Sequence, residues 1–232
     1  LSHPFFNASE TTAKKDCVWV FTSNRGLCGG FNSNLLRRTE TFFKSDMVDY
    51  QLLDVNVIGK KGREFFKARK REVKNVYLDY AENLSPEKSL EIANEMLTGY
   101  LNGDYSEYWI AYNQFKSALV QEVTIEKIVP LSSSEEKVID QTQSQNLVDY
   151  VYEPSKTEIL ENLIPRLVAI QLYRAHRESL ASELGARMTA MENASNNAKD
   201  MIRLLTLEYN RLRQAAITTE LMDIVNGAES IK

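Results

Sequence analysis

Apolar and small side chains recur every three or four residues through the last third of the chain. They lie at Leu180, Leu184, Met188, Met191, Ala194, Ala198, Met201, Leu205, Tyr209, Leu212 and Ala216. This spacing is the period of an α-helix, and it predicts one helix from Pro165 to Asn226 with Gly227 as its C-terminal cap. Such a helix is roughly 90 Å long at about 1.5 Å per residue.

The opposite face of the predicted helix is densely charged. Its charged residues are Arg187, Glu192, Lys199, Asp200, Arg203, Glu208, Arg211 and Arg213. An apolar stripe usually packs inside a helical bundle, but nothing upstream offers a helix of matching length. We therefore expect the stripe to meet a partner from outside this sequence.

Upstream, short apolar runs alternate with helical patterns. The predicted strands are Asp16–Ser23, Val55–Gly59, Val73–Leu78, Tyr108–Phe115 and Leu119–Ile128. The predicted helices are Ser33–Phe43, capped by Asn32 or Ser33, Lys61–Ala68, and one opened by Ser85 and Pro86 that runs to Leu101. This alternation predicts an α/β fold: a small Rossmann-like, doubly wound domain of mostly parallel strands, plus one very long C-terminal helix that forms a coiled coil.

Composition divides the chain into two predicted domains. Residues 1–154 form the globular domain, which includes a polar loop at 131–146 and a last strand-like piece at Leu147–Tyr152. Residues 155–232 form the long helix, in whose first turns Pro165 predicts a break or a restart.

Charge and composition exclude several classes of protein. The 232 residues are 43% hydrophobic and 26% charged with a net charge of −4, which argues against a generic nucleic-acid binder. No apolar run is long enough to insert into a membrane. The first residues, LSHPFFNASETTAKKD, do not have the pattern of a signal peptide.

Candidate chemistry is sparse. Two cysteines, Cys17 and Cys28, and two histidines, His3 and His176, cannot assemble a zinc site of the usual spacing, so we expect no metal and buried free thiols. A nucleophile, histidine and acid would have to meet by tertiary coincidence. We therefore predict no catalytic residue and no cofactor.

A glycine-rich turn, Asn24 to Asn32, follows the first predicted strand and precedes a helix. That position suits a phosphate site, but Gly26, Gly29 and Gly30 do not form a nucleotide-binding motif. A tight turn that needs the positive φ of glycine is the better interpretation.

Two stretches of the sequence resemble one family. The run YNRLRQAAITTELMDIVNGAES begins at Tyr209 and is preceded by LASELGARMTAMENASNNA from Leu180. Its pattern of I-T-x-E, an acid and G-A-x-S resembles the C-terminal helix of the gamma subunit of F-type ATP synthases. The matching residues are Ile217, Thr218, Glu220, Asp223, Gly227, Ala228 and Ser230. The segment SNRGLCGGFN from Ser23 is also similar to that family, with Asn24 where aspartate is common.

The resemblance implies a set of subunit contacts. In gamma subunits, the matching positions near the end of the helix contact the catalytic beta subunits, others face the mobile lever of the beta subunits, and a foot region approaches the membrane rotor ring and the epsilon subunit. The residues that match the positions near the end of the helix are Arg213, Gln214, Thr218 and Glu220. Arg187 and Met188 match the positions that face the lever, and Tyr150 and Glu153 match the foot region.

The implied function is a non-catalytic central stalk. Its rotation inside the hexamer of alpha and beta subunits would couple proton flow through the ring to ATP synthesis. It would be peripheral, on the cytoplasmic face of a bacterial inner membrane or on the matrix side in a mitochondrion. The family also has an N-terminal helix that pairs with the C-terminal one, and we expect this sequence to lack it. The alternatives are a stand-alone coiled-coil adaptor and an α/β enzyme with a phosphate site at the glycine-rich turn.

Overall fold

A computed structural model describes residues 5, 15–45, 53–131, 153 and 155–230. The predicted strand-like piece Leu147–Tyr152 lies outside these residues. Within the described residues, five strands form one sheet in the order β3-β2-β1-β4-β5. They are β1 Asp16–Phe21, β2 Leu53–Ile58, β3 Asn75–Tyr77, β4 Glu107–Phe115 and β5 Gln121–Val129. All neighbouring strands are parallel except β4 and β5, so the predicted mostly parallel sheet is confirmed.

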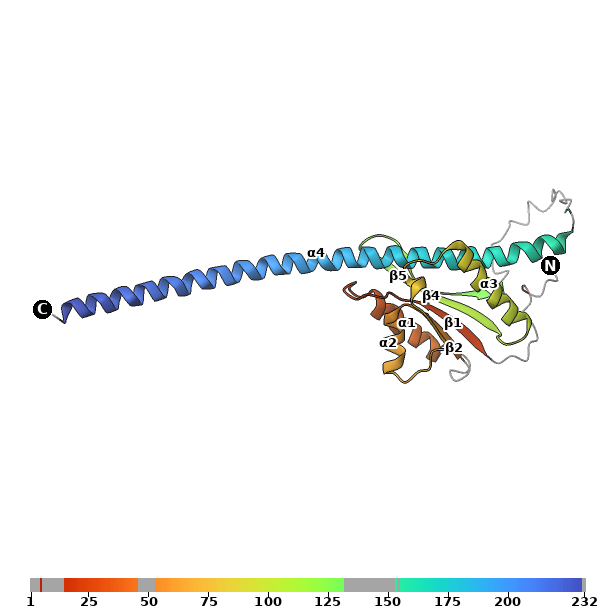
Figure 1. Cartoon of the computed structure of the whole chain (residues 1–232), viewed down its shortest axis with the longest axis horizontal. Helices are drawn as coiled ribbons and strands as arrows, with labels where there is room; N and C mark the ends of the chain where they lie inside the picture. The colour runs from red at the N-terminus through yellow and green to blue at the C-terminus, as the bar shows by residue number, and fades with distance from the viewer. Residues whose placement is uncertain (1–4, 6–14, 46–52, 132–152, 154, 231–232) are drawn as a thin grey trace, which may run out of the picture. The chain divides into compact units, whose positions relative to one another are not determined.

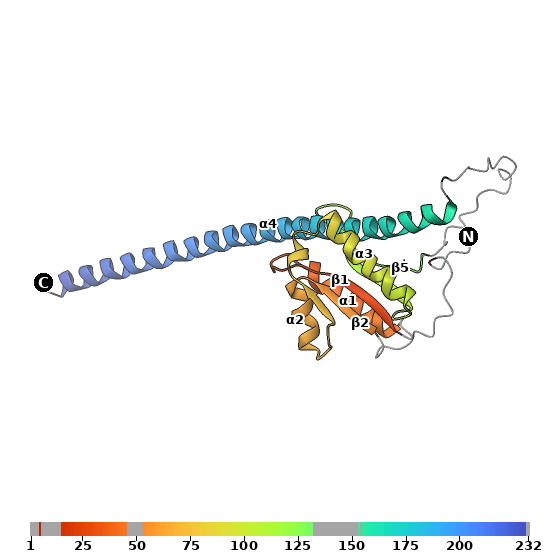
Figure 2. The ribbon, with the colours of Figure 1, turned by 45° about the vertical axis from the view of Figure 1, so that its right-hand side comes forward.

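Helices cover both faces of the sheet (Figure 1). On one face lie α1 Phe31–Ser45 and α2 Lys60–Ala68, and on the other lie α3 Pro86–Leu101 and the first half of α4 Lys156–Glu229. The turned view in Figure 2 shows the same layers. A short 3-10 turn, Asp79–Ala81, follows β3. Since β1 is completely apolar over Val18 to Phe21 and buried on both faces, it is the central strand that its sequence predicts.

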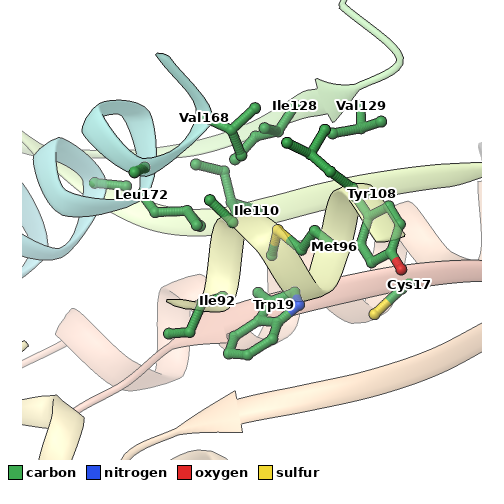
Figure 3. Close-up of a cluster of buried hydrophobic side chains, with 14 of the residues drawn as sticks. Cys17, Trp19, Ile92, Met96, Tyr108, Ile110, Ile128, Val129, Val168 and Leu172 are labelled. Atoms are coloured by element: carbon green, nitrogen blue, oxygen red, sulfur yellow. The ribbon is translucent and has the colours of Figure 1, made fainter. Parts of the chain in front are cut away.

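The core is divided by the sheet into two clusters. Val18, Val20 and Val57 point toward Phe43 of α1 and Phe66 of α2. On the other face, Trp19, Met96, Tyr108, Val168 and Leu172 belong to one buried cluster that joins β1, α3, β4 and α4 (Figure 3). The first half of α4 is therefore part of the core of the sheet domain.

The long helix corrects two expectations. Pro165 lies inside α4 and does not break it. Proline removes one backbone donor, but Ile164 and Val168 on either side are buried against the sheet and hold the helix in place. Gly227 is not a cap, because α4 continues to Glu229 and the φ of this glycine is not positive.

Helix starts give one confirmation and one correction. Ser85 caps α3, because its Oγ accepts a hydrogen bond from the backbone N–H of Lys88 at 3.3 Å. Pro86 is the first helical residue. The first helix, however, starts at Phe31, so neither Asn32 nor Ser33 is its cap. The side chain of Asn32 instead turns back to the loop before it.

The chain divides by packing into two units, Leu1–Met188 and Thr189–Lys232. The first unit contains the sheet and the first half of α4. The second contains the rest of α4. The division predicted from the sequence, at 154/155, marks where α4 begins along the chain.

Candidate interaction site

The carboxyl ends of β1 and β4 are where a doubly wound sheet usually holds its ligand, because the strand order reverses there. In this chain α4 occupies that place. The Oγ of Ser182 donates to the carbonyl oxygen of Asn113 at 3.0 Å, and the Oγ of Ser179 donates to that of Phe21 at 3.5 Å. Both serines are buried. The position of a ligand is thus taken by the protein's own helix.

Gly185 lets the turn between β4 and β5 approach the same helix. A Cβ at this position would lie 3.2 Å from both the Cα of Ala118 and the Cε2 of Phe115. That separation is tighter than an ordinary van der Waals contact. On another side of the helix, Ala186 packs with Cys28 and Phe31. Two loops of the sheet domain therefore contact α4 near Gly185 and Ala186.

The glycine-rich turn is held together by its own hydrogen bonds. The Oδ1 of Asn32 accepts from the backbone N–H of Ser23 at 3.1 Å, and its Nδ2 donates to the Ser23 Oγ at 2.8 Å and to the Cys28 Sγ at 3.3 Å. Leu27 and Gly29 have positive φ values of 61° and 55°, so the expected left-handed backbone is present. Cys17 and Cys28 are buried free thiols, as predicted.

The start of α2, the other place where an anion could bind, is also satisfied internally. The N–H of Gly62 donates to the Thr22 Oγ1 at 2.9 Å, and the N–H of Lys60 donates to the Asn24 Oδ1 at 3.1 Å. The N–H of Lys61 donates to the carbonyl oxygen of Ser23 at 3.0 Å. Phosphate sites at helix starts need free N–H groups, and these are already used. The geometry thus favours a structural turn over the phosphate-site alternative.

A polar cavity of about 700 Å³ lies at the opposite, amino end of the strands, between Lys15, Asp54, Lys74 and Tyr105. Burial raises the pKa of Asp54, but hydrogen bonds from Tyr105 and Lys15, at 2.6 and 3.2 Å, outweigh it and leave the pKa below its usual range. Burial and the bond to Asp54 raise the pKa of Tyr105. These charges satisfy one another. Among the described residues there is no group of three or more side chains that could hold a metal ion.

The predicted contact residues fall into two groups. Arg187 lies beside the sheet domain, where its Nη2 donates to the Glu183 Oε1 at 2.6 Å and to the Gly26 carbonyl oxygen at 3.5 Å. Met188 is 59% exposed. Glu153 is exposed, and Tyr150 lies outside the described residues.

The other four predicted contacts lie near the end of α4, and all of them are exposed. They are Arg213, Gln214, Thr218 and Glu220. The Thr218 Oγ1 donates to the backbone oxygen of Gln214 at 2.9 Å. In the described part of the chain, no ion pair engages Arg213 or Glu220. Their charged groups are therefore available to another molecule.

The exposed face of α4 follows a heptad pattern. Alternating steps of four and three residues connect Leu163, Leu167, Ile170, Arg174, Arg177, Ala181, Leu184, Met188, Met191, Ser195, Ala198, Ile202, Leu205, Tyr209, Leu212 and Ala216. The large apolar members of this series are 40–67% exposed. A strict seven-residue repeat is typical of a left-handed coiled coil rather than of a straight helix. We call this series the heptad face.

Sequence reasoning missed the contacts that fill the sheet crevice. The available signal was the run of small residues at Ser179, Ser182, Gly185 and Ala186, of which Ser179, Ser182 and Ala186 are spaced to lie together on one helix face and Gly185 lies on the adjoining side. Small side chains there let two loops and two strand ends approach the helix backbone.

Helix α4 fills the crevice in which a sheet of this kind usually holds its ligand, and it continues with an exposed heptad face. Together these two features define a coiled-coil stalk subunit. Comparisons with known proteins agree. The family model described as ATP synthase matches residues 1–231. The ATP synthase gamma chain of Geotalea daltonii is 45% identical over 221 residues, which are 95% of this chain and 75% of the relative. That of Geobacter metallireducens is 44% identical over the same length.

The chain belongs to the family of ATP synthase gamma chains. Two solved structures share its fold. The rotational state 3 of a Euglena gracilis mitochondrial ATP synthase, with OSCP, F1 and c-ring, contains a chain with a TM-score of 0.67 and 19% identity, and the match covers 94% of this chain and 72% of that one. The central stalk and c-ring of the Tetrahymena thermophila mitochondrial ATP synthase contain a chain with a TM-score of 0.59 and 24% identity. That match covers 81% of this chain and 79% of the other. The family resemblance of the sequence is confirmed.

Proposed function

We propose that this chain is the central-stalk rotor of an F-type, proton-translocating ATP synthase. It couples proton flow through the membrane ring to ATP synthesis in the beta subunits and is not itself catalytic. The observation that carries the proposal is the exposed heptad face of α4, in a chain 45% identical to an ATP synthase gamma chain. A helix with that face needs a partner helix, and a coiled coil gives a stiff shaft.

The end of the shaft contacts the catalytic hexamer of alpha and beta subunits. Arg213, Gln214, Thr218 and Glu220 offer exposed donors and acceptors on adjoining turns. A neutral hydrogen bond contributes a net of about 0.5–1.5 kcal/mol, whereas breaking a buried ion pair costs about 3–5 kcal/mol. Polar contacts of the weaker kind can be made and released at each of three equivalent beta subunits. Differences in these contacts would bias the conformations of the nucleotide sites.

The other predicted contact residues are assigned to the levers of the beta subunits and to the foot of the stalk. Met188, and the part of Arg187 that is not engaged by Glu183, would face the levers of the beta subunits. Tyr150 and Glu153 would form the foot that approaches the epsilon subunit and the ring. The described residues include no helix long and apolar enough to cross a bilayer. We place the chain at the membrane periphery, on the cytoplasmic face in a bacterium or on the matrix side in a mitochondrion.

The test is reconstitution of ATPase activity. Purified alpha and beta subunits are mixed with the intact subunit that carries this sequence, in its wild-type form and as Arg213→Ala with Gln214→Ala. We expect activity to depend on the added subunit and to fall about tenfold in the double variant, which corresponds to the loss of one or two net polar contacts.

The matched control is Arg203→Ala with Asn210→Ala, which removes another exposed cation and amide from the same helix. It should activate the hexamer like the wild type. If the subunit neither copurifies with the hexamer nor alters its turnover, the rotor assignment fails. Stable self-assembly into rods without alpha and beta subunits would instead support a coiled-coil adaptor.

A further inference from the structure

Positive charge is concentrated in one layer of the molecule. Helix α1 and residues 60–72 contain ten Lys and Arg against three Glu, while the rest of the chain has 18 against 29 Asp and Glu. The chain as a whole has a net charge of −4. Because α1 and α2 cover the same face of the sheet (Figures 1 and 2), this charge is collected on one side. We call it the basic face.

Ion pairs neutralise the basic face only in part. Lys44 and Arg69 share the carboxylate of Glu40, and Lys60 and Lys61 share that of Glu64. By contrast, Arg38, Arg63, Lys67 and Lys70 are exposed and form no ion pair with any described residue. A net positive surface therefore remains.

The basic face has no apolar anchor. No large hydrophobic side chain is exposed among the described residues of α1 or α2; Phe43 and Phe66 are buried in the core. Protein interfaces usually have aromatic or aliphatic side chains at their centre. A surface that is charged but not apolar suits an anionic lipid headgroup layer, which attracts Lys and Arg without requiring insertion.

The backbone places part of this charge at one end of the sheet. Arg71 donates through its Nη2 to the carbonyl oxygen of Leu53, the first residue of β2, at 3.3 Å. The end of α2 therefore lies at the amino ends of the strands. Helix α4 makes its Ser182 and Gly185 contacts at the opposite, carboxyl ends. Acidic Asp54 and Glu107, also at the amino end, are paired with Lys15 and Lys127.

We propose that the basic face binds the anionic phospholipid surface of the coupling membrane. The inference rests on the proposed function, in which the sheet domain belongs to the rotor and lies next to the coupling membrane. A fluid lipid surface is the same at every rotation angle, so an electrostatic contact with it does not hold the rotor at one position.

The first experiment is cosedimentation of the intact subunit with vesicles. Phosphatidylcholine vesicles containing phosphatidylglycerol are compared with vesicles of phosphatidylcholine alone. We expect binding only to the anionic vesicles, and release by 1 M salt, where the Debye length falls to about 3 Å. The variant Arg63→Gln, Lys67→Gln, Lys70→Gln should weaken binding about tenfold or more, because each cation near the lipid surface adds attraction.

The control variant is Lys199→Gln, Arg203→Gln, Arg211→Gln, which removes three exposed cations from α4 and should leave vesicle binding unchanged. Equal binding to both kinds of vesicle, or an equal loss in the control, overturns the proposal. Circular dichroism checks that both triple variants are folded.

The second experiment uses the assembled, membrane-reconstituted ATP synthase. A photoreactive label on Lys67→Cys should crosslink to anionic lipid. A crosslink to the ring or to another subunit instead would show a protein partner and overturn the lipid assignment. ATPase activity separates this inference from the rotor proposal: the Arg63, Lys67, Lys70 variant should still activate the hexamer. If the wild type activates the hexamer but does not bind anionic vesicles, only the lipid proposal fails, whereas absence of activation by the wild type defeats the rotor proposal.

Discussion

Residues 164–186 and 189–229 belong to one unbroken helix, yet their apolar side chains have opposite surroundings. In the first stretch, Ile164, Val168, Leu172 and Ala175 are at most 3% exposed and pack against the sheet. In the second, every residue from Met191 to Glu229 is exposed, including Leu205 at 60%. The helical period is the same in both.

The difference shows what helical periodicity determines and what it does not. Periodicity selects the side of the helix that is apolar, but the partner of that side depends on tertiary structure. The first stretch even has two apolar sides, since Leu167, Ile170 and Leu184 remain 40–67% exposed while Val168 is buried. The heptad face therefore begins at Leu163, beside the sheet domain, and its seven-residue repeat continues along the sequence of α4 to Ala216.

The largest expected difference in free energy of unfolding comes from replacing one leucine in each stretch by alanine. Leu172→Ala removes a side chain that is 1% exposed and should cost about 2–5 kcal/mol in free energy of unfolding. Leu205→Ala, the matched control, should change that free energy by less than about 0.5 kcal/mol when this 232-residue chain is measured without a partner helix. Urea unfolding followed by tryptophan fluorescence measures both, because Trp19 lies in the same cluster as Leu172. Similar losses for the two variants would mean that the second stretch is also packed.

Replacing a serine in each stretch should give a smaller contrast. Ser182→Ala leaves the buried carbonyl oxygen of Asn113 without its 3.0 Å hydrogen bond and should cost about 1–3 kcal/mol. Ser195→Ala, at an exposed position of the same helix, should be neutral or stabilising by a few tenths, because alanine is the better helix former. The same urea titration measures both. A neutral Ser182→Ala would show that the crevice is held by apolar packing alone.

The sequence was sufficient to predict the sheet and the long helix, because both depend on local patterns. The run DCVWVF reads as a central strand since it is apolar on both faces, and Ser85-Pro86 marks the start of α3 through local cap chemistry. The direction of β5 follows from its pairing with β4, which no local pattern reports. The effect of Pro165 could not be predicted either, because the packing of Ile164 and Val168 outweighs it.

The candidate site was harder to predict than the fold. The interpretation of the glycine-rich turn as structural remains a prediction, which the geometry favours. The acceptors that satisfy the N–H groups at the start of α2 come from Thr22, Ser23 and Asn24, and only the folded chain brings them there. The engagement of Arg187 by Gly26 joins residues 161 positions apart. Contacts of that range depend on topology, whereas the exposed contacts near Arg213 were named from resemblance to a family and remain predictions.

The smallest expected difference is in the pH dependence of the free energy of unfolding, and it comes from a residue of the first stretch. His176 is 1% exposed, and its Nε2 lies 3.4 Å from the carbonyl oxygen of Ala81. Burial, with a contribution from the charge of Arg177, lowers the pKa of His176 below 6.5. In the unfolded chain the imidazole takes up a proton as the pH falls through about 6.5, while in the folded chain it stays neutral. The free energy of unfolding should therefore decrease as the pH falls below that value, down to the lowered pKa.

NMR titration of the imidazole checks this directly. Since His3 is the other histidine in the chain, the variant His3→Gln leaves a single imidazole signal to follow. We expect that signal to titrate below 6.5, and His176→Gln to remove the part of the pH dependence of unfolding that it causes. A pKa at or above 6.5 would contradict the burial of the neutral imidazole in the core. No histidine lies in the exposed stretch from Thr189 to Glu229, so a pH effect of this origin separates the half of the helix that belongs to the sheet domain from the half that forms the shaft.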